Sequence, residues 1–342
     1  MNQNYHVNMG PSGFATEETC LMTVLRGNAR FQVNVEVARV DGTSFGKKLV
    51  QQMELRKRRP RGKARDMPLF DLIYQHCLPL LESLAPRTSL QDLSLEGFLH
   101  SPTYDLELTR GESSEDVRIV GGDKCVYTPA FFTSPMRIAD LPRPCKALRH
   151  FEAHNLRIAR TANEGKNLDA VQGRVVTAEG SPLYFKPRME LREAEFEREL
   201  NVLRRLDEAG LAVRLRVPRL QGVVVSGEDT IGMLMTLITS SSMGTHLRSA
   251  GLQDRHELHK QWEEQLIAIV RELHAHGIVW GDVHPTNAII DEEMNAWVID
   301  FGGMNNAEFV DDEKRETVEG DWQGLKRMFQ EWLPDAKRRS QW

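Results

Sequence analysis

Two short segments in the last quarter of the chain carry carboxylate and amide side chains at a fixed spacing. In the first, Asp282 stands five residues before Asn287, and in the second Asp300 is followed by Phe301 and Gly302. Transfer of a phosphoryl group needs one carboxylate to hold the acceptor hydroxyl, and an amide with a second carboxylate to hold a metal ion. These residue types at this spacing indicate phosphoryl-transfer chemistry.

The residues between the two segments predict how the segments are positioned. Residues 288–290 and 296–299 are apolar and strand-like, and residues 291–295 have the composition of a turn. A short antiparallel hairpin would bring Asp300 back beside Asn287. We therefore expect the two segments to form one site.

The elements upstream form an ordered series. Apolar spacing predicts a helix over residues 190–206 and a later long helix with Trp262, Leu266, Ile269, Val270 and Leu273 on one face. Strands are expected at residues 155–159, 171–177, 182–186, 220–225 and 231–238. The order of strands, one helix, strands and then helices predicts a small sheet lobe followed by a helical lobe.

Together these motifs resemble the protein-kinase-like superfamily, in particular its branch with a G-D-x-H-x-x-N loop. That branch includes aminoglycoside phosphotransferases, choline kinases and small atypical kinases. Gly281 to Asn287, followed by Asp300-Phe301-Gly302, carry the resemblance. It covers residues 146–333 and implies an α+β, protein-kinase-like two-lobed fold. The small antiparallel sheet lobe would span residues 146–238 and the reduced helical lobe residues 239–333.

The resemblance also implies cofactors and residue roles. ATP and Mg²⁺ would be the cofactors, with Asn287 and Asp300 as metal ligands. Asp282 would be the catalytic residue that orients the acceptor hydroxyl and takes its proton. Lys186 matches the lysine that contacts the α- and β-phosphates, as a point charge on a strand.

Further nucleotide contacts follow from the same resemblance. Glu199 fits the glutamate that pairs with the lysine, with Glu195, one turn earlier, as the alternative. Met235 lies near the gatekeeper position, and Thr236 to Ile238 would follow the adenine edge through backbone groups. Met235 is equally compatible with an ordinary core position.

Two residues near the loop have expected scaffold roles. Asp321 resembles the aspartate that caps the backbone of the catalytic loop, although an acidic residue also suits the start of any helix. We expect an amphipathic helix from Glu319 to Trp332. His284 matches the loop histidine of the branch and is interpreted as a structural hydrogen-bonding residue.

The chain departs from the kinase pattern in three respects. Residues 162–167 contain a single glycine where a glycine-rich phosphate loop is expected, which weakens the predicted nucleotide contacts. Trp280 replaces the histidine before the Gly-Asp pair. Only 18 residues separate Gly302 from Asp321, and ten follow Trp332, so we expect the late helices that would support an extended peptide substrate to be absent.

The rest of the chain has a less specific pattern. Residues 1–20 are expected to be a mobile N-terminus, residues 21–145 an α+β region of unassigned role, and residues 334–342 a tail. Within the second region we expect a strand over residues 29–40, a helix from residues 66–68 to Pro86, and strands at residues 104–108 and 117–120. Residues 55–65 hold seven Lys or Arg, which indicates either a solvated connector or a nuclear-import or phosphate-binding patch.

Composition excludes several classes of protein. The 342 residues carry 44 Lys and Arg against 49 Asp and Glu, a net charge of −5, so no overall field attracts nucleic acid or a membrane. The N-terminal residues do not resemble a secretory signal, and the four cysteines have no zinc or redox spacing. These features indicate a cytoplasmic or nuclear protein.

Three functions remain for comparison. The first is an ATP-dependent phosphotransferase acting on a hydroxyl of a small molecule or of a protein Ser or Thr. The second is a catalytically weak or inactive pseudokinase that serves as a scaffold or nucleotide-binding module. The third, a nuclear adaptor, depends on the basic run alone. A protein partner binding through residues 1–145 is compatible with each.

Overall fold

The structure is a computed structural model. It describes residues 6–8, 18–26, 29–57, 67–85, 93–113, 116–124, 134–159, 173–304 and 306–334. The chain divides into two compact units, one formed by Met1–Phe132 with Ala153–Ser181 and the other by Thr133–Glu152 with Pro182–Trp342.

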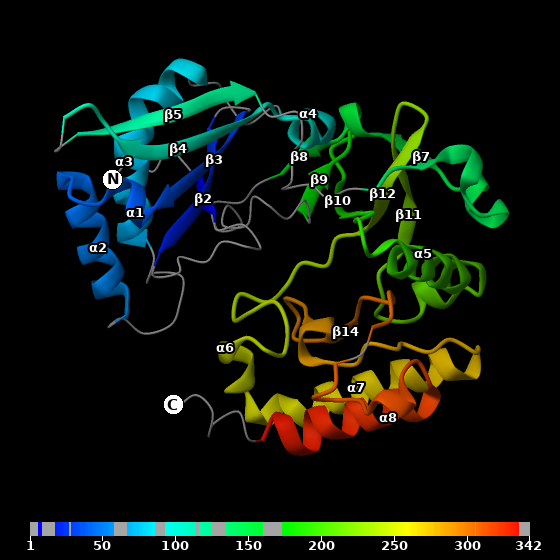
Figure 1. The fold of residues 1–342 in the computed structure, drawn as a ribbon. Coiled ribbons are helices and arrows are strands. Elements are labelled where there is room, and N and C mark those ends of the chain that lie inside the picture. The colour runs from blue at the N-terminus through cyan, green and yellow to red at the C-terminus, as the bar shows by residue number, and fades with distance from the viewer. Residues whose placement is uncertain are drawn as a thin grey trace. The chain divides into compact units, whose positions relative to one another are not determined.

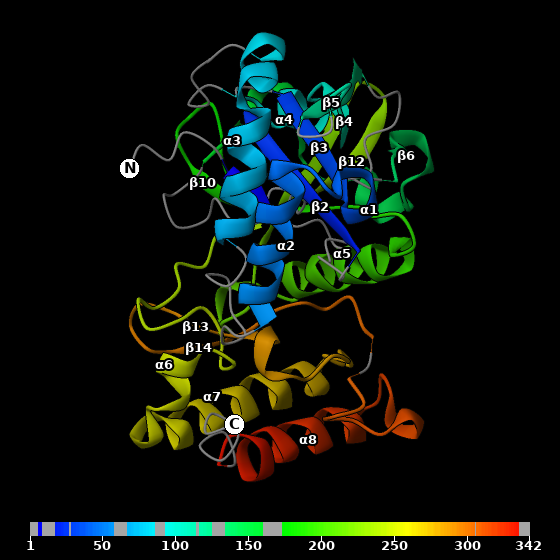
Figure 2. The ribbon, with the colours of Figure 1, turned by 60° about the vertical axis from the view of Figure 1, so that its left-hand side comes forward.

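The first unit is built on a five-stranded sheet with the order β1-β2-β3-β4-β5. Its elements are β1 (His6–Asn8), β2 (Thr19–Arg26), β3 (Ala29–Glu36), α1 (Val37–Val40), α2 (Ser44–Lys57), α3 (Met67–Leu84), α4 (Leu95–Leu99), β4 (Thr103–Arg110), β5 (Val117–Lys124), β8 (Arg157–Ile158) and β9 (Gly173–Val176). β3 and β4 are parallel, so a crossover must join them, and the helices α1 to α4 supply it. Figure 2 shows α2 and α3 running across the face of β2 and β3. Alternate residues of these strands, such as Phe31 and Val33, are buried beneath them.

Several expectations for this unit need correction. The strand predicted over residues 29–40 ends at Glu36, because Val37–Val40 turns into a short helix whose first N–H donates to the Glu18 carbonyl. Helix α2 is not expected from the sequence, and it includes residues 55–57 of the basic run. Residues 58–65 of that run, and the single-glycine segment 162–167, lie outside the described residues.

The second unit begins with a sheet in which β7, β11, β12 and β10 are neighbours in that order, and β6 pairs with β12. Its elements are β6 (Met136–Arg137), β7 (His150–Glu152), β10 (Pro182–Pro187), α5 (Glu193–Glu208), β11 (Leu220–Ser226), β12 (Asp229–Thr236), α6 (Ala250–Gln253), α7 (His256–Ala275), β13 (Ala288–Ile290), β14 (Ala296–Val298) and α8 (Val318–Lys326). Helix α5 starts three residues later than expected, because Leu191 has a φ of 64° and its segment forms a turn. The helix expected to end at Trp332 does so, but its last turn, Arg327–Trp332, is π-helical.

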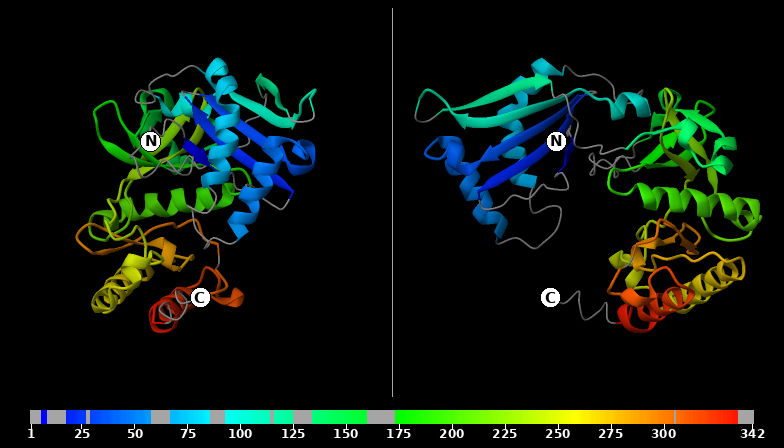
Figure 3. Two further views of the ribbon diagram at one scale, coloured as in Figure 1. Left: turned by 90° about the vertical axis from the view of Figure 1, so that its left-hand side faces the viewer. Right: turned by 45° about the vertical axis from the view of Figure 1, so that its right-hand side comes forward.

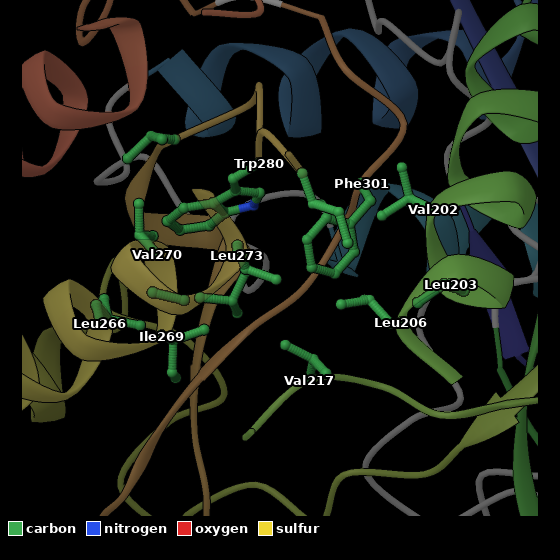
Figure 4. Close-up of a cluster of buried hydrophobic side chains, with 14 of the residues drawn as sticks. Val202, Leu203, Leu206, Val217, Leu266, Ile269, Val270, Leu273, Trp280 and Phe301 are labelled. Carbon is green, nitrogen blue, oxygen red and sulfur yellow. The ribbon is translucent and has the colours of Figure 1, made fainter. Parts of the chain in front are cut away.

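The helical part of this unit packs around α7. Figures 1 and 3 show α7 and α8 side by side, with the β13–β14 hairpin between α7 and α5. Apolar residues at helical spacing face one core, and Figure 4 shows Leu203 and Leu206 of α5 opposite Leu273 of α7. Strands, one helix, strands and then helices follow one another as predicted, and the expected α+β kinase-like fold is confirmed.

Two further observations concern the described residues as a whole. None of their helices combines the length and the apolar character that crossing a membrane requires. Cys20, Cys77 and Cys145 are buried, and Cys77 and Cys145 are free thiols. Burial raises the pKa of the Cys77 thiol to about 12, which keeps it protonated and unreactive.

Candidate active site

Lys186 is presented by the central part of the sheet in the second unit. Strand β10 pairs antiparallel with β12, so that Lys186 lies opposite Met233 and Tyr184 lies opposite Met235. Residues directly opposite in such a pair point to the same face of a sheet. Lys186, Tyr184 and the two methionines therefore share one face, and both methionines are buried in the core.

Helix α5 brings a carboxylate to that lysine. Phe196, Leu200 and Leu203 anchor the buried face of the helix, and Glu199 lies on the same face with 1% of its surface exposed. A carboxylate buried to this degree needs a charged or hydrogen-bonding partner. Lys186 Nζ supplies it by donating to Glu199 Oε2. Glu195, the alternative, instead lies 3.7 Å from Arg192.

Lys186 also contacts a second carboxylate. Its Nζ atom donates to Asp300 Oδ1 at 2.9 Å. Burial opposes the charge on Lys186, but the Glu199 and Asp300 carboxylates outweigh burial and hold the pKa of the ammonium above its usual range. Asp300 has a φ of 60°, a left-handed conformation that is uncommon for a residue other than glycine. Such strained residues cluster at functional sites.

Asp321 holds the start of the loop that carries Asp282. Its carboxylate is 1% exposed and accepts 2.8 Å hydrogen bonds from the backbone N–H groups of Trp280 and Gly281. His274 Nε2 lies 2.8 Å from Oδ2 of the same carboxylate and is a third hydrogen-bonding neighbour of Asp321. The expected capping role of Asp321 is confirmed, and His274 serves that cap.

Asp282 and Asn287 are joined directly. Asn287 Nδ2 donates to Asp282 Oδ2 at 2.8 Å and to the Asp282 carbonyl at 3.0 Å. His284 Nε2 lies 3.3 Å from the same carboxylate oxygen, and its Nδ1 lies 2.7 Å from the Thr286 hydroxyl. The loop is thus closed on itself, with both candidate side chains buried.

The predicted hairpin brings the two segments together. Ala288 pairs with Val298 in the β13–β14 ladder, and the Ile299 N–H donates to the Asn287 carbonyl at 3.1 Å. Asp300 directly follows Ile299, which is hydrogen-bonded to Asn287. The hairpin thus joins the two segments, as the sequence predicted.

Two aromatic residues fix these segments to the core. Trp280 and Phe301 are fully buried, and Figure 4 shows both among the apolar side chains between α5 and α7. The Trp280 indole donates to the Ile299 carbonyl at 2.9 Å. Trp280, which stands where a histidine was expected, thus joins the segment before Asp282 to the segment before Asp300.

The oxygens available at this site fit a hard divalent cation. Asn287 uses its NH₂ group to bond Asp282, which leaves its amide oxygen as a ligand. Asp300 bonds Lys186 and the Gly302 N–H through Oδ1 alone, which leaves Oδ2. An amide and a carboxylate oxygen are ligands that Mg²⁺ accepts together with phosphate oxygens and water. Among the described residues, no group of three or more His, Cys, Asp or Glu side chains is arranged to bind a metal ion by itself.

The remaining predicted contacts lie at the end of β12. Met235 faces the same side as Lys186, whereas Thr236 and Ile238 line a cavity of about 250 Å³ whose lining includes neither Lys186 nor Asp300. Within the described part of the chain, no backbone hydrogen bond uses the N–H or C=O group of Leu237 or Ile238. The expected contact of Thr236 to Ile238 with a nucleotide through main-chain groups stays a prediction.

Sequence reasoning missed two residues at the site. Burial raises the pKa of the Tyr184 hydroxyl to about 12, with Lys186, Glu199 and Asp300 close enough to affect it. Tyr184 stands two positions before Lys186 on a strand, and this spacing alone places the two side chains on the same face of the sheet. Arg198 on α5 reaches the backbone on both sides of the site. Nothing in its local sequence distinguishes it from a solvated helix charge.

Comparison with known proteins agrees with this geometry. The sequence profile described as the lipopolysaccharide kinase (Kdo/WaaP) family matches residues 151–340, which is 190 of the 342 residues. Two mouse (Mus musculus) proteins, sperm motility kinase 3A and sperm motility kinase 3B, are 29% identical to the chain over 79 residues. The match covers 23% of this chain and 16% of each mouse protein.

Proposed function

The chain belongs to the lipopolysaccharide kinase (Kdo/WaaP) family, and from that premise we propose that it is an ATP-dependent phosphotransferase that moves the γ-phosphoryl group of ATP to a hydroxyl acceptor. The observation that carries the proposal is the position of Lys186 between the carboxylates of Glu199 and Asp300. In kinase sites the lysine–glutamate pair and the metal-binding aspartate must both be in place for transfer.

Each residue has a role that its surroundings support. Lys186 is held by Glu199 on one side and so presents its remaining donor capacity to the α- and β-phosphates. Asn287 and Asp300 would hold Mg²⁺, which neutralises charge on the phosphates when it is bound. Asp282 uses Oδ2 for Asn287 and His284, and its Oδ1 atom is left to orient the acceptor hydroxyl and receive its proton.

The acceptor is proposed from the family name alone. A lipopolysaccharide hydroxyl is the first acceptor to test, because the family is named for that substrate. A protein Ser or Thr hydroxyl is the second acceptor to test. The structure of the site suits either acceptor, since Asp282 needs only a hydroxyl group.

Binding of Mg²⁺ and ATP tests the nucleotide half of the proposal. Isothermal titration of wild type should show binding that requires both ATP and Mg²⁺, and Lys186→Met should weaken it by about tenfold or more. Lys260→Met is the matched control, because Lys260 is 84% exposed on α7 and its one ion pair within the described residues is with Glu264. Equal affinities in wild type and both variants would contradict the assigned role of Lys186.

The pseudokinase alternative predicts a different combination of results. It rests on the missing glycine-rich loop, whose residues lie outside the described part of the chain. A protein that binds Mg²⁺ and ATP but transfers no phosphoryl group to any hydroxyl, including water, would support this alternative.

A further inference from the structure

Arg198 contacts the backbone of both carboxylate-bearing segments. Its Nη2 atom donates to the Val279 carbonyl at 3.3 Å and its Nη1 atom to the Trp280 carbonyl at 3.3 Å. Nη1 also donates to the Phe301 carbonyl. The first two carbonyls precede Gly281-Asp282 and the third directly follows Asp300. One side chain therefore joins the two segments that carry the proposed catalytic base and a proposed metal ligand.

The neighbouring residue on α5 completes this attachment. The Phe301 N–H donates to Glu199 Oε1 at 3.4 Å. Arg198 and Glu199 together thus hold both main-chain polar groups of Phe301, the residue next to Asp300. Because Glu199 also binds Lys186, a movement of α5 would displace Lys186, Asp300 and the Asp282 loop together.

The fit around Arg198 is close. Gly281 has a φ of 86°, and a Cβ atom at that position would lie 2.6 Å from Arg198 Nη2. A guanidinium presents several N–H donors in a planar fork, whereas a lysine ammonium acts as a point charge. The three carbonyls are reached from two separate nitrogens, Nη1 and Nη2, whereas the three N–H donors of a lysine all lie on one atom. The Arg198 side chain is 23% exposed, so water competes little for these bonds.

We infer that Arg198 is a positioning residue that fixes the Asp282 segment relative to the Asp300 segment. Its catalytic consequence rests on the proposed phosphotransferase function, while its structural consequence does not. Displacing a reacting group by about 1 Å can lower a rate about 100-fold, so loss of this attachment should act on the chemical step.

Arg205 is a matched control on the same helix. It stands two turns after Arg198, and its Nη2 atom donates to the carbonyls of His276 and Gly277 at 3.3 and 3.2 Å. These carbonyls belong to the segment that leads from α7 to the loop, but Arg205 contacts neither carboxylate-bearing segment. A residue that merely attaches α5 to the helical part of the unit would behave as Arg205 does.

The experiment compares Arg198→Ala with Arg205→Ala by two readouts. Hydrogen exchange of backbone amides does not depend on activity. Arg198→Ala should accelerate it about tenfold or more in residues 279–283 and 299–303, because three of the bonds that hold these segments are lost. Turnover of Mg²⁺·ATP by Arg198→Ala should show a kcat about 10- to 100-fold lower, with the KM for ATP changed less than about threefold. Arg205→Ala should leave both readouts within about twofold of wild type.

Several outcomes would overturn the inference. One is an equal effect of Arg205→Ala, and another is unchanged exchange in either segment of Arg198→Ala. If Arg198→Ala does not fold, Arg198→Lys and Arg205→Lys give the same comparison, because lysine retains the charge without the fork. Absence of turnover in wild type would count against the proposed function, and exchange would then decide the positioning role alone.

Discussion

The Nζ atom of Lys186 lies 2.9 Å from Oδ1 of Asp300, although the two residues are 114 positions apart in the sequence. The same ammonium also pairs with Glu199, which is 1% exposed. One lysine thus connects strand β10, helix α5 and the segment after the β13–β14 hairpin. The predictions below follow from the charges and backbone groups gathered at this junction.

Removing the lysine should destabilise the fold. Lys186→Met leaves Glu199 buried without its cation, and breaking a buried pair on one side costs about 3–5 kcal/mol. Replacing both partners, as in Lys186→Met with Glu199→Met, should cost less than the single change, because no uncompensated charge remains there. Urea unfolding measures both free energies, and a double variant less stable than the single one would contradict this account of the pair.

The pH dependence of that effect has a definite sign. Because the pKa of Lys186 is raised above its ordinary value of 10.5, its contribution to stability is fully present below that value and is lost as pH rises through the raised pKa. Burial raises the pKa of the Glu199 carboxyl, and loss of Lys186 raises it further, because Lys186 lowers that pKa in wild type. The difference in unfolding free energy between wild type and Lys186→Met should therefore be largest near about pH 9 and shrink as pH falls, because Glu199 of the variant then takes up a proton and loses its unpaired charge. A difference that grows as pH falls would contradict this account of the pair.

Loss of the Asp321 cap should be costly. Asp321→Ala leaves the buried N–H groups of Trp280 and Gly281 without acceptors, at about 1–3 kcal/mol each. Asp311→Ala is the control, because the Asp311 side chain is 41% exposed and its pair with Arg327 should contribute at most about 1 kcal/mol. Thermal unfolding should show a much larger decrease in Tm for Asp321→Ala, and similar decreases would refute the capping role.

Gly281 should tolerate no side chain. Gly281→Ala combines a positive φ of 86° with a Cβ atom 2.6 Å from Arg198 Nη2. Gly227→Ala in the β11–β12 turn has a similar φ of 61°, with nothing within 4 Å of its Cβ, and so isolates the backbone cost of about 1 kcal/mol. We expect Gly281→Ala to lose clearly more stability than Gly227→Ala. Arg198→Ala should relieve part of this excess in the double variant, as measured by a double-mutant cycle.

Side-chain substitutions at the end of β12 should weaken the binding of ATP less than substitution of Lys186 does. Ile238 lines the 250 Å³ cavity, whose lining includes neither Lys186 nor Asp300, and Ile238→Ala shortens its side chain without changing its main chain. Its affinity for Mg²⁺·ATP, measured by titration, should stay within about twofold of wild type if only backbone groups contact the base. A tenfold loss would place that side chain against the nucleotide instead.

The sequence predicts the residues of the candidate site better than it predicts the residues that hold them in position. Asp282, Asn287 and Asp300 are recognisable because their spacing is local and the hairpin between them is short. Lys186 and Glu199 follow from the resemblance to the kinase-like superfamily, whereas apolar spacing predicted helix α3 (Met67–Leu84). Asp321 was foreseen only as one of two possibilities, because any first helical turn favours an acidic residue.

What the sequence did not predict depends on distant contacts. Arg198 looks like one charge among many on α5, and only the folded chain brings it to carbonyls 81 to 103 positions away. Helix α2 was missed because its apolar periodicity is weak. The strand expected over residues 29–40 was too long because Val37 and Val40 suit a strand by themselves, whereas the chain enters helix α1 directly after Glu36.

The central claim is most directly tested by phosphoryl transfer from radiolabelled ATP to a lipopolysaccharide or protein acceptor, or to water, with Mg²⁺ present. Wild type should turn over ATP, and both Asp282→Asn and Asp300→Ala should lower kcat by about 1,000-fold. Only Asp300→Ala should also change the dependence on Mg²⁺, since Asp300 is the proposed ligand. Equal background rates in wild type and both variants would contradict the assignment of this site as a phosphotransferase centre.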